Sequence, residues 1–357
     1  MHMSDALLSL PVAGTFLAIS TAALAVSAKQ AATDPRAQAA RMGVLGAFVF
    51  AAQMINFSIP GTGSSGHFAG STLLSLLLGP WAGALVLASV LTVQALFFAD
   101  GGLLAWGANV FNMGLIGCFI AVPLVYRGLA GTSPSQGRRR LAILAASLTA
   151  CVGGAFAVTV ETTVSGLTDL PFSRFALLMI PVHAAIGVAE GFITIAVLEQ
   201  LPAWSQAQGA PRPHEGRRVA GVALAAVLVA GLLSWFASAR PDGLEYSVAK
   251  LGVEPSGAPG SLNQRLTQWQ AQHALLPDYD FRPGPAGTTA AVQAEVEPAS
   301  RNGLGTHGAA APSAAEPWPK LSKGTSIAGL GGALLVALLA LGLGGLASWW
   351  SRRRAEA

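Results

Sequence analysis

The chain has 357 residues, of which 52% are hydrophobic and 11% are charged. A soluble domain carries about 25% charged residues, so this composition excludes a soluble globular protein and predicts a membrane protein. The net charge of +4 does not indicate nucleic-acid binding, because the arginines stand in short clusters beside apolar segments.

The first two residues, Met1 and His2, can chelate a metal ion. The amino group of Met1, the backbone amide of His2 and the ring of His2 close a five-membered and a six-membered ring around one ion. A ring nitrogen of His67, after the glycine-rich segment 59–66, would complete a planar four-nitrogen site. That geometry suits Ni(II), Cu(II) or low-spin Co(II) and disfavours tetrahedral Zn(II). The alternative for His67 is an ordinary polar contact in a loop.

The first apolar stretch, 7–28, has a cleavage-like sequence at Val26–Ala28. A secretory signal needs positive residues before its apolar core, but here Asp5 comes before it, and Lys29 and Arg36 come after it. This charge order predicts an uncleaved span with the N-terminus outside. Cleavage is the alternative, and it would remove Met1 and His2.

Apolar runs predict about nine membrane segments, judged against the roughly 20 residues that cross a bilayer. The second and third segments are short, which is tolerated where backbone is buried in protein or lines a cavity. Cys118 and Cys151 lie in apolar stretches and are predicted to be core residues. The nine segments lie near 7–28, 42–57, 67–79, 80–98, 104–126, 141–162, 174–198, 219–238 and 326–350.

With the N-terminus outside, the connections 29–41, 127–140 and 199–218 and the tail after 350 fall in the cytoplasm. These parts contain 13 of the 21 lysines and arginines, as the positive-inside rule requires. The same topology places Met1, His2 and the loop 56–66 on one outer face.

The outer loop 239–325 is rich in Pro, Gly, Ala and polar residues. A short amphipathic piece is predicted around Leu262–Leu275, and Arg282–Pro319 is predicted to be a flexible linker. The last span contains many small residues, which permit close helix packing, although a plain anchor fits that segment equally well.

Polar residues inside apolar segments are a second group of candidates. Asp100, Asn109 and Asn112 lie close together in sequence, and Gln94 comes shortly before them. Polar groups at membrane depth need partners, so each of these residues either joins helices by hydrogen bonds or holds a histidine ring beside a metal.

His183 and Glu190 are two helical turns apart on one face of the seventh span. They are predicted to be a packing or coupling element, and an ion pair or a proton path is an alternative. Glu161 lies in a similar position on the sixth span and is given no role.

The sequence contains no G-x-x-x-x-G-K-[ST] phosphate loop, so the chain is not expected to hydrolyse ATP itself. It also lacks H-E-x-x-H, G-x-S-x-G and C-x-x-C, which leaves metalloprotease, serine hydrolase and redox functions without support. We therefore expect a protein that is not an enzyme.

Four ordered motifs within residues 1–200 carry a family resemblance: Met1–Ser9, Asn56–His67, Asp100–Gly114 and His183–Gly191. They resemble the CbiM/NikM family, the substrate-capture components of cobalt and nickel energy-coupling-factor transporters. Residues 219–350 resemble the small companion subunit CbiN/NikN, through Arg240–Tyr246 and Leu276–Tyr279. The chain thus resembles a fusion of the two.

The resemblance implies an all-α membrane bundle of about seven helices, followed by two further transmembrane helices around the extracytoplasmic loop 239–325. It divides the chain into a metal-capture domain at 1–200, a cytoplasmic linker at 201–218, the companion region at 219–350 and a cytoplasmic tail at 351–357. Family members commonly begin His-Ile-Pro-Asp-Gly, whereas this chain has His-Met-Ser-Asp-Ala at 2–6. That departure leaves the ligands in place and changes the turn that presents them.

The resemblance also implies that metal is bound by the Met1 amine, by the amide and ring of His2 and by His67. Met1 must then be deformylated and retained. The expected partners are membrane lipid, a transmembrane coupling subunit and two cytoplasmic ATPase subunits, in a bacterial inner membrane. The transported ligand is Ni(II) or Co(II), with nickel favoured by analogy with fused relatives, and no cofactor is expected.

Two other functions remain open on the sequence. A self-sufficient secondary transporter or channel would use His183, Glu190 and Glu161 as a proton relay. A membrane-anchored binding or sensor protein would use the region 239–325 and would not need residues 1–200.

Overall fold

The computed structural model describes residues 1–31, 35–201, 215–252, 260–282 and 318–355. In this part of the chain, six helices are long and apolar enough to cross a membrane. They lie at Leu10–Gln30, Pro80–Phe98, Trp106–Ala130, Gln136–Ser165, Phe172–Gln200 and Lys323–Ala347. The predicted all-α membrane fold is confirmed, and the number of nine spans stays a prediction.

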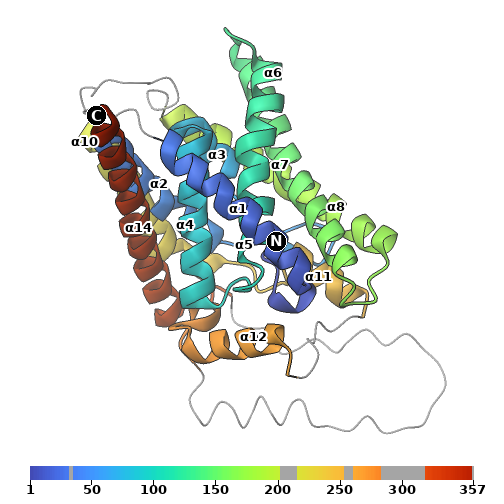
Figure 1. The fold of residues 1–357 in the computed structure, drawn as a ribbon. Coiled ribbons are helices and arrows are strands. Elements are labelled where there is room, and N and C mark those ends of the chain that lie inside the picture. Colours follow the sequence, from blue (N-terminus) through green and yellow to red (C-terminus); the bar gives the residue numbers. More distant parts are fainter. Residues whose placement is uncertain (32–34, 202–214, 253–259, 283–317, 356–357) are drawn as a thin grey trace, which may run out of the picture.

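The first half of the chain forms a bundle of helices with one short hairpin (Figure 1). Its elements are η1 (Asp5–Leu7), α1 (Leu10–Gln30), α2 (Pro35–Gln53), β1 (Phe57–Ser58), β2 (Ser65–Gly66), α3 (Ser71–Leu78), α4 (Pro80–Phe98), α5 (Trp106–Asn109), the π-helical stretch η2 (Val110–Tyr126), α6 (Arg127–Ala130), α7 (Gln136–Ser165) and α8 (Phe172–Gln200).

The second half adds two long helices and a group of short ones. Its elements are α10 (Glu215–Gly231), η3 (Leu233–Phe236), α11 (Gly243–Lys250), α12 (Leu262–His273), η4 (Pro277–Tyr279) and α14 (Lys323–Ala355). The predicted tail at 351–357 is therefore helical through Ala355. Most of the predicted linkers 201–218 and 282–319 lies outside the described residues.

The segment expected to be a simple loop at 56–66 is a small antiparallel hairpin, in which Phe57 pairs with Gly66 and Ser58 with Ser65. Gly61 and Gly63 close it with φ angles of 77° and 81°, which glycine adopts without strain. The hairpin leads directly into His67, which is only 8% exposed. The hairpin thus places the His67 side chain in the interior of the bundle.

The predicted segments 67–79 and 80–98 are separated in the structure at Gly79 and Pro80, where the two ranges meet. Gly79 has a φ of 83°, and Pro80 begins α4. The eight residues of α3 span roughly 12 Å, which is too short to cross a membrane. The segment that leads into α3, residues 67–70, is therefore buried within the bundle.

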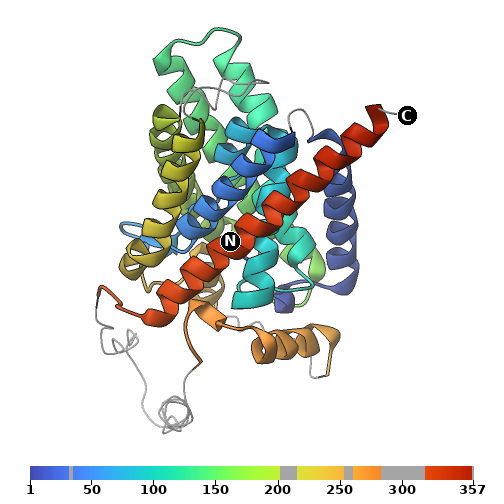
Figure 2. The same cartoon turned by 90° about the vertical axis from the view of Figure 1, so that its left-hand side faces the viewer.

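The two halves of the chain pack tightly together. In Figure 2, α14 crosses the bundle obliquely, and it lies mainly along α2. A Cβ at position 332 would collide with the rings of Phe50 and Phe98, so the close approach of α14 requires glycine there. Cys118 and Cys151 are buried and free, as predicted.

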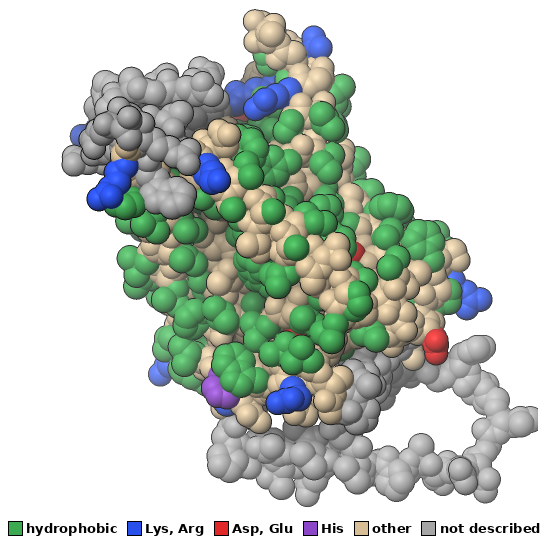
Figure 3. All heavy atoms as spheres, viewed as in Figure 1, with side chains coloured by type: hydrophobic (Ala, Val, Ile, Leu, Met, Phe, Trp, Pro, Cys, Tyr) green, Lys and Arg blue, Asp and Glu red, His purple; other side chains and the backbone are tan. Residues whose placement is uncertain are grey.

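Charged side chains lie at the two ends of the bundle, and the middle of the face in Figure 3 is largely apolar. The N-terminal residues, α11 and α12 lie towards one end, whereas α6 and the C-terminus lie at the other (Figure 1). This distribution suits a multi-pass membrane protein with two different faces.

Candidate metal site

The N-terminal arm, residues 1–8, is folded into the bundle. Met1, Met3, Leu7 and Leu8 are all at most 4% exposed, so the hydrophobic effect holds the arm in place. Asn109, at the end of α5, accepts a hydrogen bond from the Met3 N–H at 2.8 Å and donates one to the Met3 carbonyl at 3.1 Å. These contacts fix the position of the two residues that precede Met3.

The arm is also held further along. Asp5 accepts hydrogen bonds from the backbone N–H groups of Leu104 and Ala105 at 2.8 and 2.9 Å. Asn263 of α12 donates to the carbonyls of Asp5 and Leu8 at 2.5 and 2.7 Å. Both halves of the chain therefore anchor the N-terminus.

The Met1 amino nitrogen lies 3.4 Å from Nε2 of His67. The rings of His2 and His67 are stacked, with their centroids 5.0 Å apart and their planes at 16°. Nitrogens bound about 2 Å from one metal in a plane lie roughly 2.8 to 4 Å apart. The amine and His67 are thus spaced as two ligands of one ion would be.

Two carboxylates contact these nitrogens. Asp242 accepts a hydrogen bond from the Met1 amino group at 2.5 Å. Oδ1 of Asp100 lies 3.1 Å from Nδ1 of His2, and Oδ2 of Asp100 accepts from the Tyr279 hydroxyl at 2.5 Å. Because Nδ1 is the ring nitrogen that a His2 chelate uses, a metal must displace Asp100 from it.

The electrostatics keep both imidazoles neutral. Burial and, after it, the charge of the N-terminal ammonium lower the pKa of His2 and His67 to about 3. Burial raises the pKa of Asp100 against the hydrogen bond from Tyr279. Burial alone would raise the pKa of Asp242 as well, but the adjacent ammonium holds it well below its usual range. Neutral rings are the form that binds metals.

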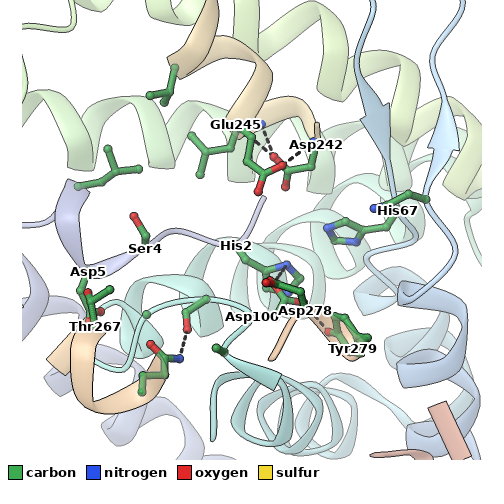
Figure 4. A pocket seen from close by; sticks show the side chains of 18 of the residues that line it. His2, Ser4, Asp5, His67, Asp100, Asp242, Glu245, Thr267, Asp278 and Tyr279 are labelled. Carbon is green, nitrogen blue, oxygen red and sulfur yellow. Dashed lines mark hydrogen bonds and ion pairs between the residues drawn. The ribbon is translucent and has the colours of Figure 1, made fainter. Parts of the chain in front are cut away.

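A cavity of about 860 Å³ leads to this site. In Figure 4, Asp242 and Glu245 form one wall, and Asp100, Asp278 and Tyr279 lie near His2. Among the described residues that line the cavity, five are acidic and none is lysine or arginine. Such a lining attracts cations.

The other predicted residues have different partners. Asn112 donates to Glu161 at 2.8 Å and contacts Sδ of Met3 at 3.7 Å, so it supports the arm and does not contact a histidine ring. Glu190 accepts from the Ala69 N–H at 2.9 Å and from the Cys151 thiol at 3.6 Å.

Glu190 thereby holds the backbone just after His67. His183 contacts the Met179 carbonyl at 2.8 Å through Nδ1. His183 and Glu190, for which an ion pair was one alternative, therefore have different hydrogen-bond partners in the structure.

Sequence reasoning missed four residues from the second half: Asp242, Asn263, Gln270 and Tyr279. Gln270 donates to the carbonyls of Ala95 and Gly101 at 2.8 and 2.7 Å. Asp242 and Tyr279 lie in the two motifs that resemble the companion subunit, and these motifs could have marked them as functional residues. Asn263 and Gln270 carry no sequence signal, because only the packing of α12 brings them to the first half.

Within the described residues, no group of three or more His, Cys, Asp and Glu side chains could hold a metal ion. Side chains alone are therefore insufficient at this position. A metal bound between Met1, His2 and His67 needs the main-chain amine and amide as additional donors.

Two family models match the chain. Residues 2–206 match the model described as "Cobalt uptake substrate-specific transmembrane region". Residues 216–348 match the model of the PDGLE domain. The two models together cover both halves.

Several transport proteins are similar in sequence. A putative fused nickel transport protein NikMN of Archaeoglobus fulgidus is 33% identical over 288 residues, which are 78% of this chain and 88% of that protein. The fused nickel transport protein NikMN of Rhodobacter capsulatus is 29% identical over 311 residues, with the same two shares. A cobalt transport protein CbiM of Sorangium cellulosum is 30% identical over 45% of this chain and 72% of its own length.

One solved structure, described as a truncated transition metal transporter, matches with a TM-score of 0.50 and 28% identity. The match covers 57% of this chain and 99% of that chain. The likeness extends over a part of this molecule about the size of its first half.

Proposed function

We infer that this chain, which belongs to the CbiM family of cobalt uptake substrate-specific transmembrane proteins and carries a PDGLE domain, captures Ni(II) or Co(II) at its own N-terminus. Membership makes the chain a nickel or cobalt transport component. The proposal adds the ligands: the Met1 amine, the amide and Nδ1 of His2, and Nε2 of His67. The observation that carries it is the 3.4 Å separation of the Met1 amine from His67.

Capture requires two protons to leave the protein, one from the Met1 ammonium and one from the His2 amide. The contact of His2 with Asp100 is given up as Nδ1 turns to the metal, whereas the Met1 amino group, with two N–H bonds left, can keep its contact with Asp242. The imidazoles are neutral already, so they lose no proton. Four nitrogens in a plane favour Ni(II) and Co(II) over ions that need tetrahedral or oxygen-rich shells.

Nickel is the proposed cargo, because the relatives fused in the same way are described as nickel transport proteins. The donor set itself accepts cobalt as well. Competition between the two ions during binding to purified protein measures the preference.

We propose that the end of the bundle carrying the site faces outwards in a bacterial inner membrane. The end with α6 and the C-terminus would face the cytoplasm and contact a transmembrane coupling subunit and two ATPase subunits. The arginines of that end support this orientation. Vesicle uptake that needs ATP and all partner subunits supports it, and uptake by the chain alone favours a secondary transporter.

The decisive experiment measures metal content and affinity of the detergent-purified chain. The variants are His2→Ala, His67→Ala and a chain with one extra residue before Met1, whose N-terminus is checked by intact mass. All three are expected to lose stoichiometric Ni(II) and Co(II) binding. Retention of metal by the extended chain would place the site elsewhere.

A further inference from the structure

Residues 238–250 of the second half lie against the hairpin that carries His67. The Ser65 N–H donates to the Pro241 carbonyl at 2.8 Å, and its hydroxyl donates to the Arg240 carbonyl at 2.7 Å. The Ser238 N–H donates to the Asn56 carbonyl at 2.7 Å. These contacts make the hairpin and the segment a single unit.

The sequence Pro-Asp-Gly-Leu-Glu at 241–245 fixes one carboxylate within that unit. Oδ1 of Asp242 caps α11 by accepting from the N–H groups of Leu244 and Glu245, both at 2.8 Å. The Glu245 carboxylate completes a capping box by accepting from the Asp242 N–H at 3.0 Å.

Gly243 and Leu244, the next two residues, fix the position of the first turn of α11. A Cβ at Gly243 would lie only 2.7 Å from Cε1 of His183. Glycine at this position therefore allows the first turn of α11 to pack directly against α8. Leu244 is 3% exposed and anchors the first turn in the core. The position of Asp242 is therefore determined by its neighbours on both sides.

The helix cap uses Oδ1 of Asp242, so Oδ2 is available for a different partner. That second oxygen, Oδ2, faces the Met1 amino group at 2.5 Å, and the side chain is 14% exposed. An amine that has lost one proton and bound a metal still carries two N–H bonds. The contact with Oδ2 can therefore persist when the amine becomes a ligand.

We propose that Asp242 is a positioning residue of the capture site, which holds the Met1 amino group beside His67 before and after a divalent cation binds. The proposal rests on the proposed function. It assigns a task to the PDGLE domain: to supply the acceptor that orients a ligand belonging to the other half of the chain. Acceptors that orient metal ligands typically change metal affinity by about 10- to 100-fold.

The test uses the full chain with Asp242→Asn. Asparagine caps a helix as well as aspartate does, so Oδ1 can stay with Leu244 and Glu245. Its amide group replaces the oxygen that accepts from the amine. Ni(II) affinity is measured by calorimetry, and the visible absorption of planar Ni(II) reports the donor set.

Asp278→Asn is the matched control. Asp278 lines the same cavity, and its φ is 52°, a conformation that asparagine tolerates well. The control therefore removes the same charge without contacting the amine or straining the backbone. If Asp242→Asn does not fold, Asp242→Ser keeps a helix cap and likewise lacks an oxygen that reaches Met1.

Asp242→Asn is expected to bind Ni(II) about 10- to 100-fold more weakly with an unchanged absorption band. Asp278→Asn should change affinity by about twofold or less. Unchanged affinity in Asp242→Asn, or equal losses in both variants, would overturn the proposal. A shifted band would also overturn it, because Asp242 would then be a ligand.

His2→Ala, measured in the same series, distinguishes a failure of the proposed role of Asp242 from a failure of the proposed capture site. If it abolishes binding while Asp242→Asn binds normally, only the role of Asp242 fails. If His2→Ala binds like the wild type, the proposed capture site itself fails.

Discussion

The two halves of the chain make different contributions to one site. The first half supplies every nitrogen proposed to bind the metal, from Met1, His2 and His67. The second half supplies no ligand, yet Asp242 contacts the Met1 amine and Tyr279 contacts the carboxylate of Asp100. The proposed ligands thus come from one half, whereas several of the contacts that hold them in place come from the other.

This contrast gives a fused second half a use even if, as proposed, the first half contains every ligand. A free N-terminus has many conformations, and ordering it opposes binding. Contacts from α11, α12 and η4 restrict the arm before the metal arrives. Four measurements test this division between the proposed ligands and the residues that support them.

The largest effect should be the dependence of metal affinity on pH. Burial, and after it the charge of the N-terminal ammonium, lower the pKa of both rings to about 3, so the rings release no proton when a metal binds near pH 7. The metal then displaces one proton from the His2 amide and one from the Met1 ammonium, so affinity should rise by up to about 100-fold per pH unit. Calorimetry in buffers of different ionisation enthalpy counts these protons. Release of three or more would mean that a ring starts protonated.

Asn109→Ala tests the support that the first half provides. It removes both hydrogen bonds to the buried Met3 backbone, and each unsatisfied group costs about 1–3 kcal/mol. We expect Ni(II) affinity to fall about 30- to 100-fold. Asn112→Ala, whose contacts go to Glu161 and Met3 Sδ, is the control and should lose much less. Equal losses would contradict a specific role for Asn109.

Tyr279→Phe tests the support that the second half gives to Asp100. The change removes a hydroxyl and keeps the ring, which stacks on Phe98 at 4.8 Å. A hydrogen bond to a charged group is worth about 1.5–3 kcal/mol, but a cavity open to water offers Asp100 replacement partners. Because Asp100 must also leave Nδ1 of His2 when a metal binds, we expect affinity to change by no more than about fivefold, less than in Asn109→Ala. A loss as large as that of His2→Ala would make Tyr279 part of the ligand set.

Glu190→Gln should have the smallest effect, within about twofold of wild type for binding and uptake. The glutamine carbonyl can still accept from the Ala69 N–H and keep His67 in place. Glu190→Leu, which leaves that N–H unpaired, should be about tenfold weaker. If instead Glu190→Gln abolishes uptake and leaves metal binding intact, a proton relay through Glu190 gains support.

Most of the helical architecture was predictable, because long apolar runs, the break at Gly79-Pro80 and the small residues of the last span are local signals. The ligand candidates were also visible, since a histidine at position 2 has a chelating geometry independent of the fold. Asp242 could not be placed, because its contact with Met1 joins residues 241 positions apart. The hairpin at 57–66 was missed because two-residue strands have no periodicity to detect.

One metal is proposed to bind between Met1, His2 and His67. Anomalous diffraction from crystals of the full chain soaked in Ni(II) would locate that ion. We expect one ion bound in a plane by the Met1 amine, the His2 amide, Nδ1 of His2 and Nε2 of His67. An ion bound instead to the oxygens of Asp100, Asp242 or Asp278, with the amine uncoordinated, would contradict it.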